Sequence, residues 1–177
     1  MGKMESINSK LIRDIHDFPK PGIVFKDITP LLSDANSFKA IAQQFAEAAG
    51  DSDYIVGIEA RGFIFAAAAA IESAKGFIPL RKSGKLPGPV SKQRYELEYG
   101  SAEIEIHNDI YLKDSNVLIV DDVLATGGTA IAAIQLCQQV GLKVAGLAFL
   151  LEIPGLGGRS LINKHFPELQ IKVLLAE

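Results

Sequence analysis

Two adjacent aspartates and the glycine-bearing turn after them are the residues of this chain best suited to chemistry. Asp121 and Asp122 follow the apolar run 117–120, whose aliphatic side chains predict a strand buried on both faces of a parallel sheet. Ligands of open α/β sheets bind at the carboxyl ends of such strands. The stretch 125–129 then removes bulk where backbone amides can approach an anion, at the start of an amphipathic segment. Because a helix N-terminus favours phosphate, the pattern predicts a ribose phosphate site, with carboxylates for the sugar hydroxyls.

The same residues allow a plainer interpretation. Asp121 and Asp122 can cap a helix, and the glycines after them can form a tight turn that binds no ligand. A motif of this kind stays a hypothesis until the elements around it bring its groups together. The order of strands and helices along the chain therefore bears on the choice.

Strand-like and helix-like patterns alternate along the chain. Apolar runs predict buried strands, and apolar residues at helical spacing predict helices. We expect strands at 23–28, 54–58, 77–80, 103–106, 117–120, 144–151 and 172–175, and helices at 5–15, 36–49, 62–74 and 128–140. Asn36 or Ser37 would cap the second helix, and the glycine-rich stretch 155–158 is expected to be a loop. This alternation predicts a single-domain α/β fold over residues 1–177, with a mainly parallel twisted sheet flanked by helices.

The stretch 83–100 lacks a clear periodicity and contains two prolines and three glycines. Loops of this length inside a compact domain are uncommon and tend to be lids or disordered segments. We therefore expect a lid over the site. A β-hairpin arm used only for packing is the alternative, because strand-like alternation resumes at 103–106.

Composition and charge limit the functional classes. The chain has a net charge of −3 and 22% charged residues, which gives no electrostatic reason to expect nucleic acid. No uninterrupted apolar stretch reaches membrane-spanning length, and the first residues lack a signal-peptide core, so we expect no membrane association and a cytoplasmic location. Cys137 is the single cysteine, which excludes an intrachain disulfide, and we expect it to be buried in a helix. The three histidines lack metal-ligand spacing, so we expect no direct metal site.

Five stretches carry a resemblance to a known family. The stretch 117–129 resembles the phosphoribosyl pyrophosphate (PRPP) signature of type I phosphoribosyltransferases, with four hydrophobic residues, two acids and a Thr-Gly-Gly-Thr loop. The stretches 19–28, 57–63, 79–87 and 95–100 resemble the adenine-specific members of that family, in the same order. The resemblance implies the type I fold and purine salvage, in which the 5-phosphoribosyl group of PRPP is transferred to adenine N9. AMP and pyrophosphate are the implied products, and Mg²⁺, held mainly by PRPP, is the implied cofactor.

The resemblance also implies a role for each matching residue of the PRPP site. Asp121 and Asp122 would hold the ribose hydroxyls. The 5′-phosphate would be cradled by Ala125, Thr126, Gly127, Gly128 and Thr129. The pyrophosphate would be met by Arg61, Arg81, Lys82 and Lys85, some of them reaching across from a neighbouring subunit of a homodimer.

The implied base site combines an N-terminal stretch with the lid. Val24 and Lys26 would bind adenine through backbone groups, while Phe25 stacks on the ring. Family members often carry arginine where this chain has Lys26. Because the implied recognition of adenine uses backbone groups, this difference affects only the part of the implied role that depends on the side chain. Glu98 would act as a general acid or as a hydrogen-bond partner of the purine, with Tyr99 beside it.

Three further expectations come from the resemblance. Residues 1–35 would form a small N-terminal hood that contributes to the base site, and 83–100 would be the flexible lid loop. Related enzymes hold a cis peptide bond at the turn that contains Glu59 and Ala60, so we expect one between these residues.

Two other functions share features with this one. A phosphoacceptor receiver domain shares the adjacent acids, but those acids lie near its N-terminus and no phosphate-cradling turn follows them. A non-catalytic nucleotide-sensing regulator on the same fold would be expected to lack the glutamate at position 98 or to carry a basic surface. The chain has Glu98 and a mildly acidic balance, so the enzyme is the favoured reading.

Overall fold

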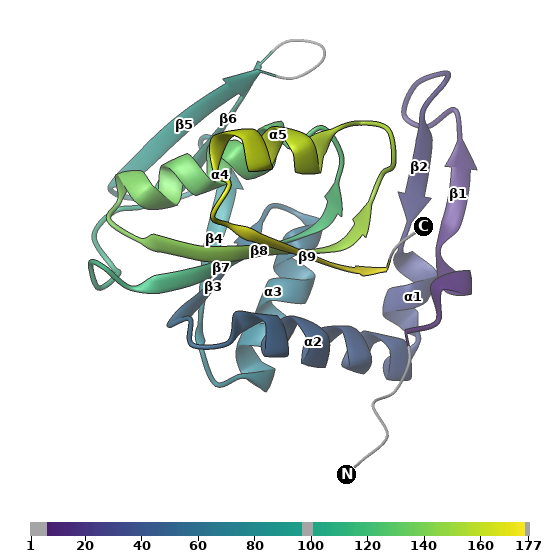
Figure 1. Ribbon diagram of the computed structural model, residues 1–177, viewed down its shortest axis with the longest axis horizontal. Helices are drawn as coiled ribbons and strands as arrows, with labels where there is room; N and C mark the ends of the chain where they lie inside the picture. Colours follow the sequence, from purple (N-terminus) through teal and green to yellow (C-terminus); the bar gives the residue numbers. More distant parts are fainter. Residues whose placement is uncertain (1–6, 97–100, 176–177) are drawn as a thin grey trace.

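A seven-stranded sheet lies at the centre of the structure, a computed structural model that describes residues 7–96 and 101–175 (Figure 1). Its strands are β3 (Tyr54–Ile58), β4 (Gly76–Lys82), β5 (Val90–Glu96), β6 (Ser101–His107), β7 (Asn116–Leu124), β8 (Lys143–Glu152) and β9 (Gln170–Leu175). They are ordered β5-β6-β4-β3-β7-β8-β9. The strands from β4 to β9 in this order pair in parallel, whereas β6 is antiparallel to both β4 and β5. The expected mainly parallel sheet is confirmed.

Helices cover both faces of this sheet. Figure 1 shows α2 (Ala35–Ala49) and α3 (Arg61–Glu72) on one face, and α4 (Gly128–Gln139) and α5 (Gly158–His165) on the other. Each face has its own cluster of buried side chains, with Phe45 and Phe65 in the first and Ile134 and Ile162 in the second. Truncating a buried phenylalanine of this kind costs about 3–5 kcal/mol. None of the helices described is long and apolar enough to cross a membrane.

The strand β7 carries the two aspartates. Residues 117–120 are at most 3% exposed because helices cover both faces of the sheet. We expected this strand to end at Val120, but its pairing with β8 continues to Leu124. Asp121 and Asp122 therefore lie inside the paired strand, still toward its carboxyl end as expected, and only the predicted last residue of the strand is wrong.

The N-terminal segment forms a small separate sheet. The strand β1 (Arg13–His16) pairs antiparallel with β2 (Val24–Asp27), after the short 3₁₀ helix η1 (Ser9–Leu11). The helix expected at 5–15 is therefore wrong, whereas the extended stretch at 23–28 is confirmed by β2. The short helix α1 (Thr29–Ser33) then leads into α2. Pairing with β2 decides the conformation of this segment, and all four residues of β1 are exposed, so the apolar spacing does not mark a helix face packed on the core.

The expected long loop between β4 and β6 is largely a β-hairpin. The strand β5 runs antiparallel to β6 with continuous pairing from Val90–His107 to Glu96–Ser101. Figure 1 shows this hairpin projecting from the edge of the sheet. The expectation of an aperiodic stretch is corrected in favour of the paired arm that was the alternative, residues 97–100 lie outside the described residues, and the role as a lid stays a prediction.

Three further expectations about helices are corrected. The side chain of Asp34, rather than Asn36 or Ser37, caps α2 by accepting a hydrogen bond from the backbone N of Ser37. The helix α5 was missed because its sequence is polar and starts at a glycine that we assigned to a loop. The apolar helix begins at Arg61 and ends at Glu72, a slight shift from the expected 62–74. Cys137 is fully buried in α4, as expected.

Candidate active site

The ends of neighbouring strands bring distant charged residues to one edge of the sheet. Glu59 follows β3, Arg81 and Lys82 end β4, and Asp121 and Asp122 lie near the end of β7. These three strands are parallel neighbours, so their carboxyl ends meet at one edge. That edge is where α/β sheets bind ligands.

The two aspartates have different surroundings. Asp122 is 6% exposed, and its Oδ2 lies 2.6 Å from an Nη of Arg61, so its charge is compensated. Asp121 is partly exposed, and its Oδ1 accepts a hydrogen bond from the backbone N of Asp122. Although part of Asp121 is exposed, the surrounding protein desolvates its carboxyl group, and this desolvation, and next the charge of Asp122, raise the pKa of Asp121. A Cβ added to Gly62 would lie 2.8 Å from that Oδ1, so only glycine lets α3 start this close to β7.

Residues 125–129, named the phosphate loop here after their predicted role, border the same hollow as Asp121. The hollow has a volume of about 70 Å³ and is lined by Asp121, Val123, Leu124, Ala125, Thr126, Gly127, Thr129, Ala130 and Phe149. Gly127 has φ +86° and precedes α4, so the loop turns into a helix N-terminus. Free backbone N–H groups and the helix dipole favour an anion there. The structure thus brings the Asp121 carboxylate and the loop 125–129 to one hollow, and their roles in binding a sugar and a phosphate stay predictions.

Arg61 connects the central sheet to the small N-terminal sheet. Besides its ion pair with Asp122, its guanidinium donates to the carbonyl O of Lys26 at 3.0 Å. Its Cζ lies 4.7 Å from the centre of the Phe25 ring, within cation–π range. Arg61 is partly exposed, so it is accessible from solvent. The peptide bond between Glu59 and Ala60, just before it, is cis, which confirms that expectation.

The predicted adenine-binding residues lie together on β2. Val24 is 43% exposed, and the ring of Phe25 contacts Phe18 edge-on at 5.2 Å between centroids. The Nζ of Lys26 pairs with Asp14 of β1 at 3.0 Å. The lysine side chain therefore ties β1 to β2, whereas backbone groups of β2 remain the candidates for base recognition.

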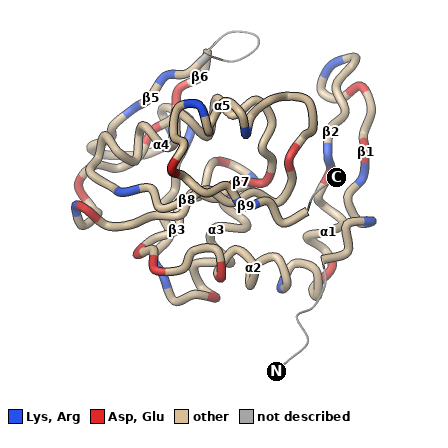
Figure 2. The backbone as a smooth tube through the Cα atoms, viewed as in Figure 1, with Lys and Arg blue, Asp and Glu red and all other residues tan. Residues whose placement is uncertain are grey.

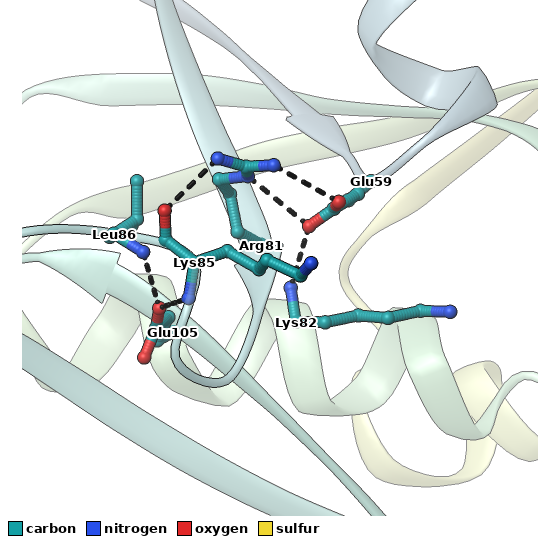
Figure 3. A network of polar contacts seen from close by, with 6 residues as sticks. All are labelled: Glu59, Arg81, Lys82, Lys85, Leu86 and Glu105. Carbon is teal, nitrogen blue, oxygen red and sulfur yellow. Dashed lines mark hydrogen bonds and ion pairs between the residues drawn. The ribbon is translucent and has the colours of Figure 1, made fainter.

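A network of carboxylates and backbone groups shapes the turn at 82–86 after β4, shown in Figure 3. The Glu59 carboxylate accepts hydrogen bonds from Nε and an Nη of Arg81, at 3.2 and 3.1 Å, and from the backbone N of Lys82 at 2.9 Å. Arg81 also donates to the carbonyl O of Lys85 at 3.0 Å. The hydrogen bonds from Arg81 lower the pKa of Glu59. Lys82 and Lys85 are exposed, so the network presents two ammonium groups on a fixed turn.

Glu105 holds this turn from the neighbouring strand β6. It is 1% exposed, and its Oε1 accepts the backbone N–H groups of Lys85 and Leu86, each at 2.7 Å. Burial alone would raise the pKa of Glu105, but the backbone donors of Gly84, Leu86 and Lys85 outweigh it and bring the pKa below its ordinary value of 4.5. The buried carboxylate therefore stays ionised at neutral pH.

Replacing Glu105 with alanine is expected to lower the free energy of unfolding by about 1–3 kcal/mol, because two backbone donors lose their acceptor. The contribution of a carboxyl with a lowered pKa is present above its unfolded-state pKa and is lost as the pH falls through the folded-state value. Urea unfolding at pH 7 and below pH 4.5 measures both effects. Glu105→Gln keeps an acceptor oxygen, so it should restore most of the stability, and equal losses for both variants would contradict the assignment.

Two candidate residues, Glu98 and Tyr99, lie outside the described residues. A larger hollow, about 510 Å³, lies at the opposite end of β7 and β8, beside Gly50 and Lys172. We place the active site by its chemistry at the carboxyl end, where the predicted residues converge.

Sequence reasoning missed the supporting acids Glu59 and Glu105. Each forms contacts with residues about twenty positions away, which no local spacing reveals. An acid directly after a buried strand was the one available signal for Glu59.

Comparison with known proteins agrees with this geometry. The family described as the phosphoribosyl transferase domain matches residues 30–169. The chain belongs to the phosphoribosyltransferase family. This phosphoribosyltransferase is 52% identical to the adenine phosphoribosyltransferase of Streptomyces coelicolor over 166 residues, which cover 93% of this chain and 91% of that relative. It is 54% identical to the enzyme of the same name from Paracoccus denitrificans over 154 residues, covering 86% and 82%.

Solved structures extend the similarity to three dimensions. The crystal structure of adenine phosphoribosyltransferase from Thermoanaerobacter pseudethanolicus is 44% identical with a TM-score of 0.89, covering 99% of this chain and 100% of that chain. The Saccharomyces cerevisiae enzyme, in complex with adenine and an imino-altritol bisphosphate, is 38% identical with a TM-score of 0.85, covering 94% and 95%. The expected type I phosphoribosyltransferase fold is therefore confirmed.

Proposed function

We propose that this phosphoribosyltransferase transfers the 5-phosphoribosyl group from PRPP to N9 of adenine in purine salvage, forming AMP and pyrophosphate. The observation that carries the proposal is the shared hollow, in which the Asp121 carboxylate and the phosphate loop face one space. Relatives about half identical over most of the chain carry the name adenine phosphoribosyltransferase. Adenine in the complex of the yeast enzyme supports the choice of base.

The reaction needs positioning and charge stabilisation more than covalent help. N9 of adenine forms a bond to C1′ of the ribose as the bond from C1′ to the pyrophosphate oxygen breaks, the pyrophosphate leaves with the bonding electron pair, and the N9 proton passes to Glu98 or to solvent water. Asp121 and Asp122 would hold the ribose hydroxyls, and residues 125–129 would hold the 5′-phosphate. Arg61, Lys82 and Lys85 would stabilise the leaving pyrophosphate, with Arg81 bracing the turn from which the lysines extend.

Adenine would bind between the N-terminal sheet and the strand ends. Backbone groups of Val24 and Lys26 would recognise its edge, and Phe25 would stack on its ring. Glu98, with Tyr99 beside it, would approach the base from the segment between β5 and β6. Closure of that arm would exclude water, which otherwise hydrolyses the activated ribose.

Mg²⁺ fits the available donors as a substrate-bound ion. Asp121 and Asp122 offer two carboxylates, of which one is already paired with Arg61. Mg²⁺ keeps several waters and is usually held by one or two carboxylates together with substrate phosphates. When bound, it supplies charge neutralisation and orientation of the pyrophosphate.

A cytoplasmic location stays a prediction.

Incubation of the purified protein with adenine, PRPP and Mg²⁺ tests the proposal directly. AMP and pyrophosphate are expected in equal amounts, with hypoxanthine and guanine as much poorer acceptors. Nucleotide binding without AMP formation would instead favour the non-catalytic sensor.

A homodimer is also proposed, with α3 at its centre. Ile64 is 39% exposed and Ile71 is 84% exposed, and their spacing of seven residues places them on one face of α3. Phe77 of β4, which is 37% exposed, contacts Phe63 of α3 edge-on. A second copy of this chain would bury this apolar face and bring the turn at 82–86 beside the partner's site.

Ile71→Glu is expected to convert the dimer to a monomer, because a charge would be buried at the centre of the contact. Sedimentation velocity at micromolar protein measures the change. Leu112→Glu is the matched control, since Leu112 is 73% exposed on the loop before β7. A dimer that survives Ile71→Glu would show that the contact lies elsewhere.

A further inference from the structure

The first residue of α5 lies against the phosphate loop without room for a side chain. A Cβ added to Gly158 would lie 2.2 Å from the carbonyl O of Ala125 and 3.0 Å from the backbone N of Gly127. The contact is reciprocal, because a Cβ on Gly127 would lie 2.8 Å from the carbonyl O of Gly158. Two glycines therefore let two backbone segments touch where the loop makes its turn.

Arg159 fixes this end of α5 to the sheet. Its guanidinium forms a fork with the Glu152 carboxylate at the end of β8, with distances of 2.6 to 3.2 Å. The remaining Nη donates to the carbonyl O of Ile171 in β9 at 3.1 Å. Ile162, one turn further along α5, is fully buried in the core. The start of α5 thus has a set position relative to β8 and β9.

A second link joins the same region to β7. The backbone N of Ile153, directly after β8, donates to the carbonyl O of Leu124 at 2.9 Å. Leu124 is the residue before the phosphate loop. The loop is therefore bordered by a fixed strand end on one side and by the fixed start of α5 on the other.

We infer that Gly158 and Arg159 are positioning residues for the 5′-phosphate, acting through the phosphate loop rather than by touching the ligand. The inference rests on the proposed role of residues 125–129. A loop with consecutive glycines has many backbone conformations, and an anion site needs its N–H groups to converge. The contact with Gly158 restricts the loop at Ala125 and Gly127, and Arg159 holds Gly158 in place.

Gly158→Ala tests the inference. The added methyl must displace the loop, so the dissociation constant for AMP is expected to rise at least about tenfold, while that for adenosine, which lacks the phosphate, stays unchanged. In the same variant KM for PRPP should rise while KM for adenine does not. A general loss of folding would not separate AMP from adenosine. Isothermal titration with both ligands measures the difference.

Gly155→Ala is the matched control in the same segment. Gly155 has φ +85°, so alanine is strained there, yet a Cβ would meet nothing within 4 Å. This variant is expected to lose some stability and to keep the affinity for AMP. Equal weakening of AMP binding in both variants would point to general loosening and would overturn the inference.

Arg159 gives an independent test if Gly158→Ala fails to fold. Arg159→Gln removes the fork with Glu152 and should weaken AMP binding several-fold, again without change for adenosine, and Arg159→Lys should restore part of the loss. Thr129→Val, inside the phosphate loop, separates the inferred positioning role of Gly158 and Arg159 from the proposed phosphate-binding role of the loop itself. If Thr129→Val weakens AMP binding and neither Gly158→Ala nor Arg159→Gln does, the inference is wrong. If Thr129→Val also has no effect, the proposed phosphate site itself fails.

Discussion

Replacing Arg61 with alanine is expected to lower kcat/KM for PRPP by about 10²- to 10³-fold, the range seen when one preorganised charge-stabilising donor is lost. Arg61 faces three groups at once, namely Asp122, the carbonyl O of Lys26 and the ring of Phe25. The variant would therefore lose the guanidinium charge that stabilises the leaving pyrophosphate. It would also lose the link between the base site and the central sheet. Steady-state kinetics with each substrate varied in turn measures the loss.

Two further variants sharpen this prediction. Arg61→Lys keeps the charge but not the planar fork, so it should recover only part of the activity. Lys143→Gln is the control, because Lys143 lies at the amino end of β8, opposite the carboxyl strand ends, and forms an exposed ion pair with Asp114 at 3.0 Å, and such pairs contribute little. Figure 2 shows how widely charges of both signs are spread along the chain, so a loss specific to Arg61 is informative. Unchanged kinetics for Arg61→Ala would remove it from the mechanism.

Replacing Glu98 with alanine is expected to lower kcat by about 10²- to 10⁴-fold, the range for loss of a positioned general acid or base. Affinity for PRPP should change much less, because the interaction with the purine forms late in the reaction. Pre-steady-state turnover and equilibrium binding of PRPP together separate the two quantities.

The glutamine variant distinguishes the two roles considered for Glu98. A glutamine cannot transfer the proton but can still form a hydrogen bond with the purine. If Glu98 is a general acid, Glu98→Gln should therefore lower kcat as much as Glu98→Ala does. If Glu98 is a hydrogen-bond partner of the purine, Glu98→Gln should keep more of the kcat. Glu168→Ala, an exposed carboxylate before the amino end of β9, is the control. A near-normal kcat in Glu98→Ala would contradict both roles.

The central strand and its turn were predictable because their signals are local. Residues 117–120 are apolar without interruption, and the acids and glycines follow directly, so a buried strand and a turn into a helix can be inferred from one window, although the strand itself continues to Leu124. The parallel arrangement then followed from the alternation of elements, and it brings Arg61, Arg81 and Asp121 to one edge as expected.

The errors arose where distant contacts decide the structure. The segment with Ile12 and Ile15 has apolar residues at helical spacing, yet strand pairing with β2 decides its conformation. The polar stretch from Val90 to Glu96 has little apolar periodicity because β5 lies at the edge of the sheet. The contact of Gly158 with Ala125 leaves no trace in spacing, since it depends on the path of β8 and α5 together.

The N-terminal hairpin has a consequence for how new activities arise in this scaffold. Within the part of the chain that the structure describes, its two strands pair with each other and not with the central sheet, to which Arg61 bridges them. Under the proposed assignment, the residues that select the nucleobase lie on the small N-terminal sheet, and the residues that bind PRPP lie on the central sheet. Substitutions confined to β2, whether natural or from a randomised library, can therefore change which base is accepted without altering the residues that bind PRPP.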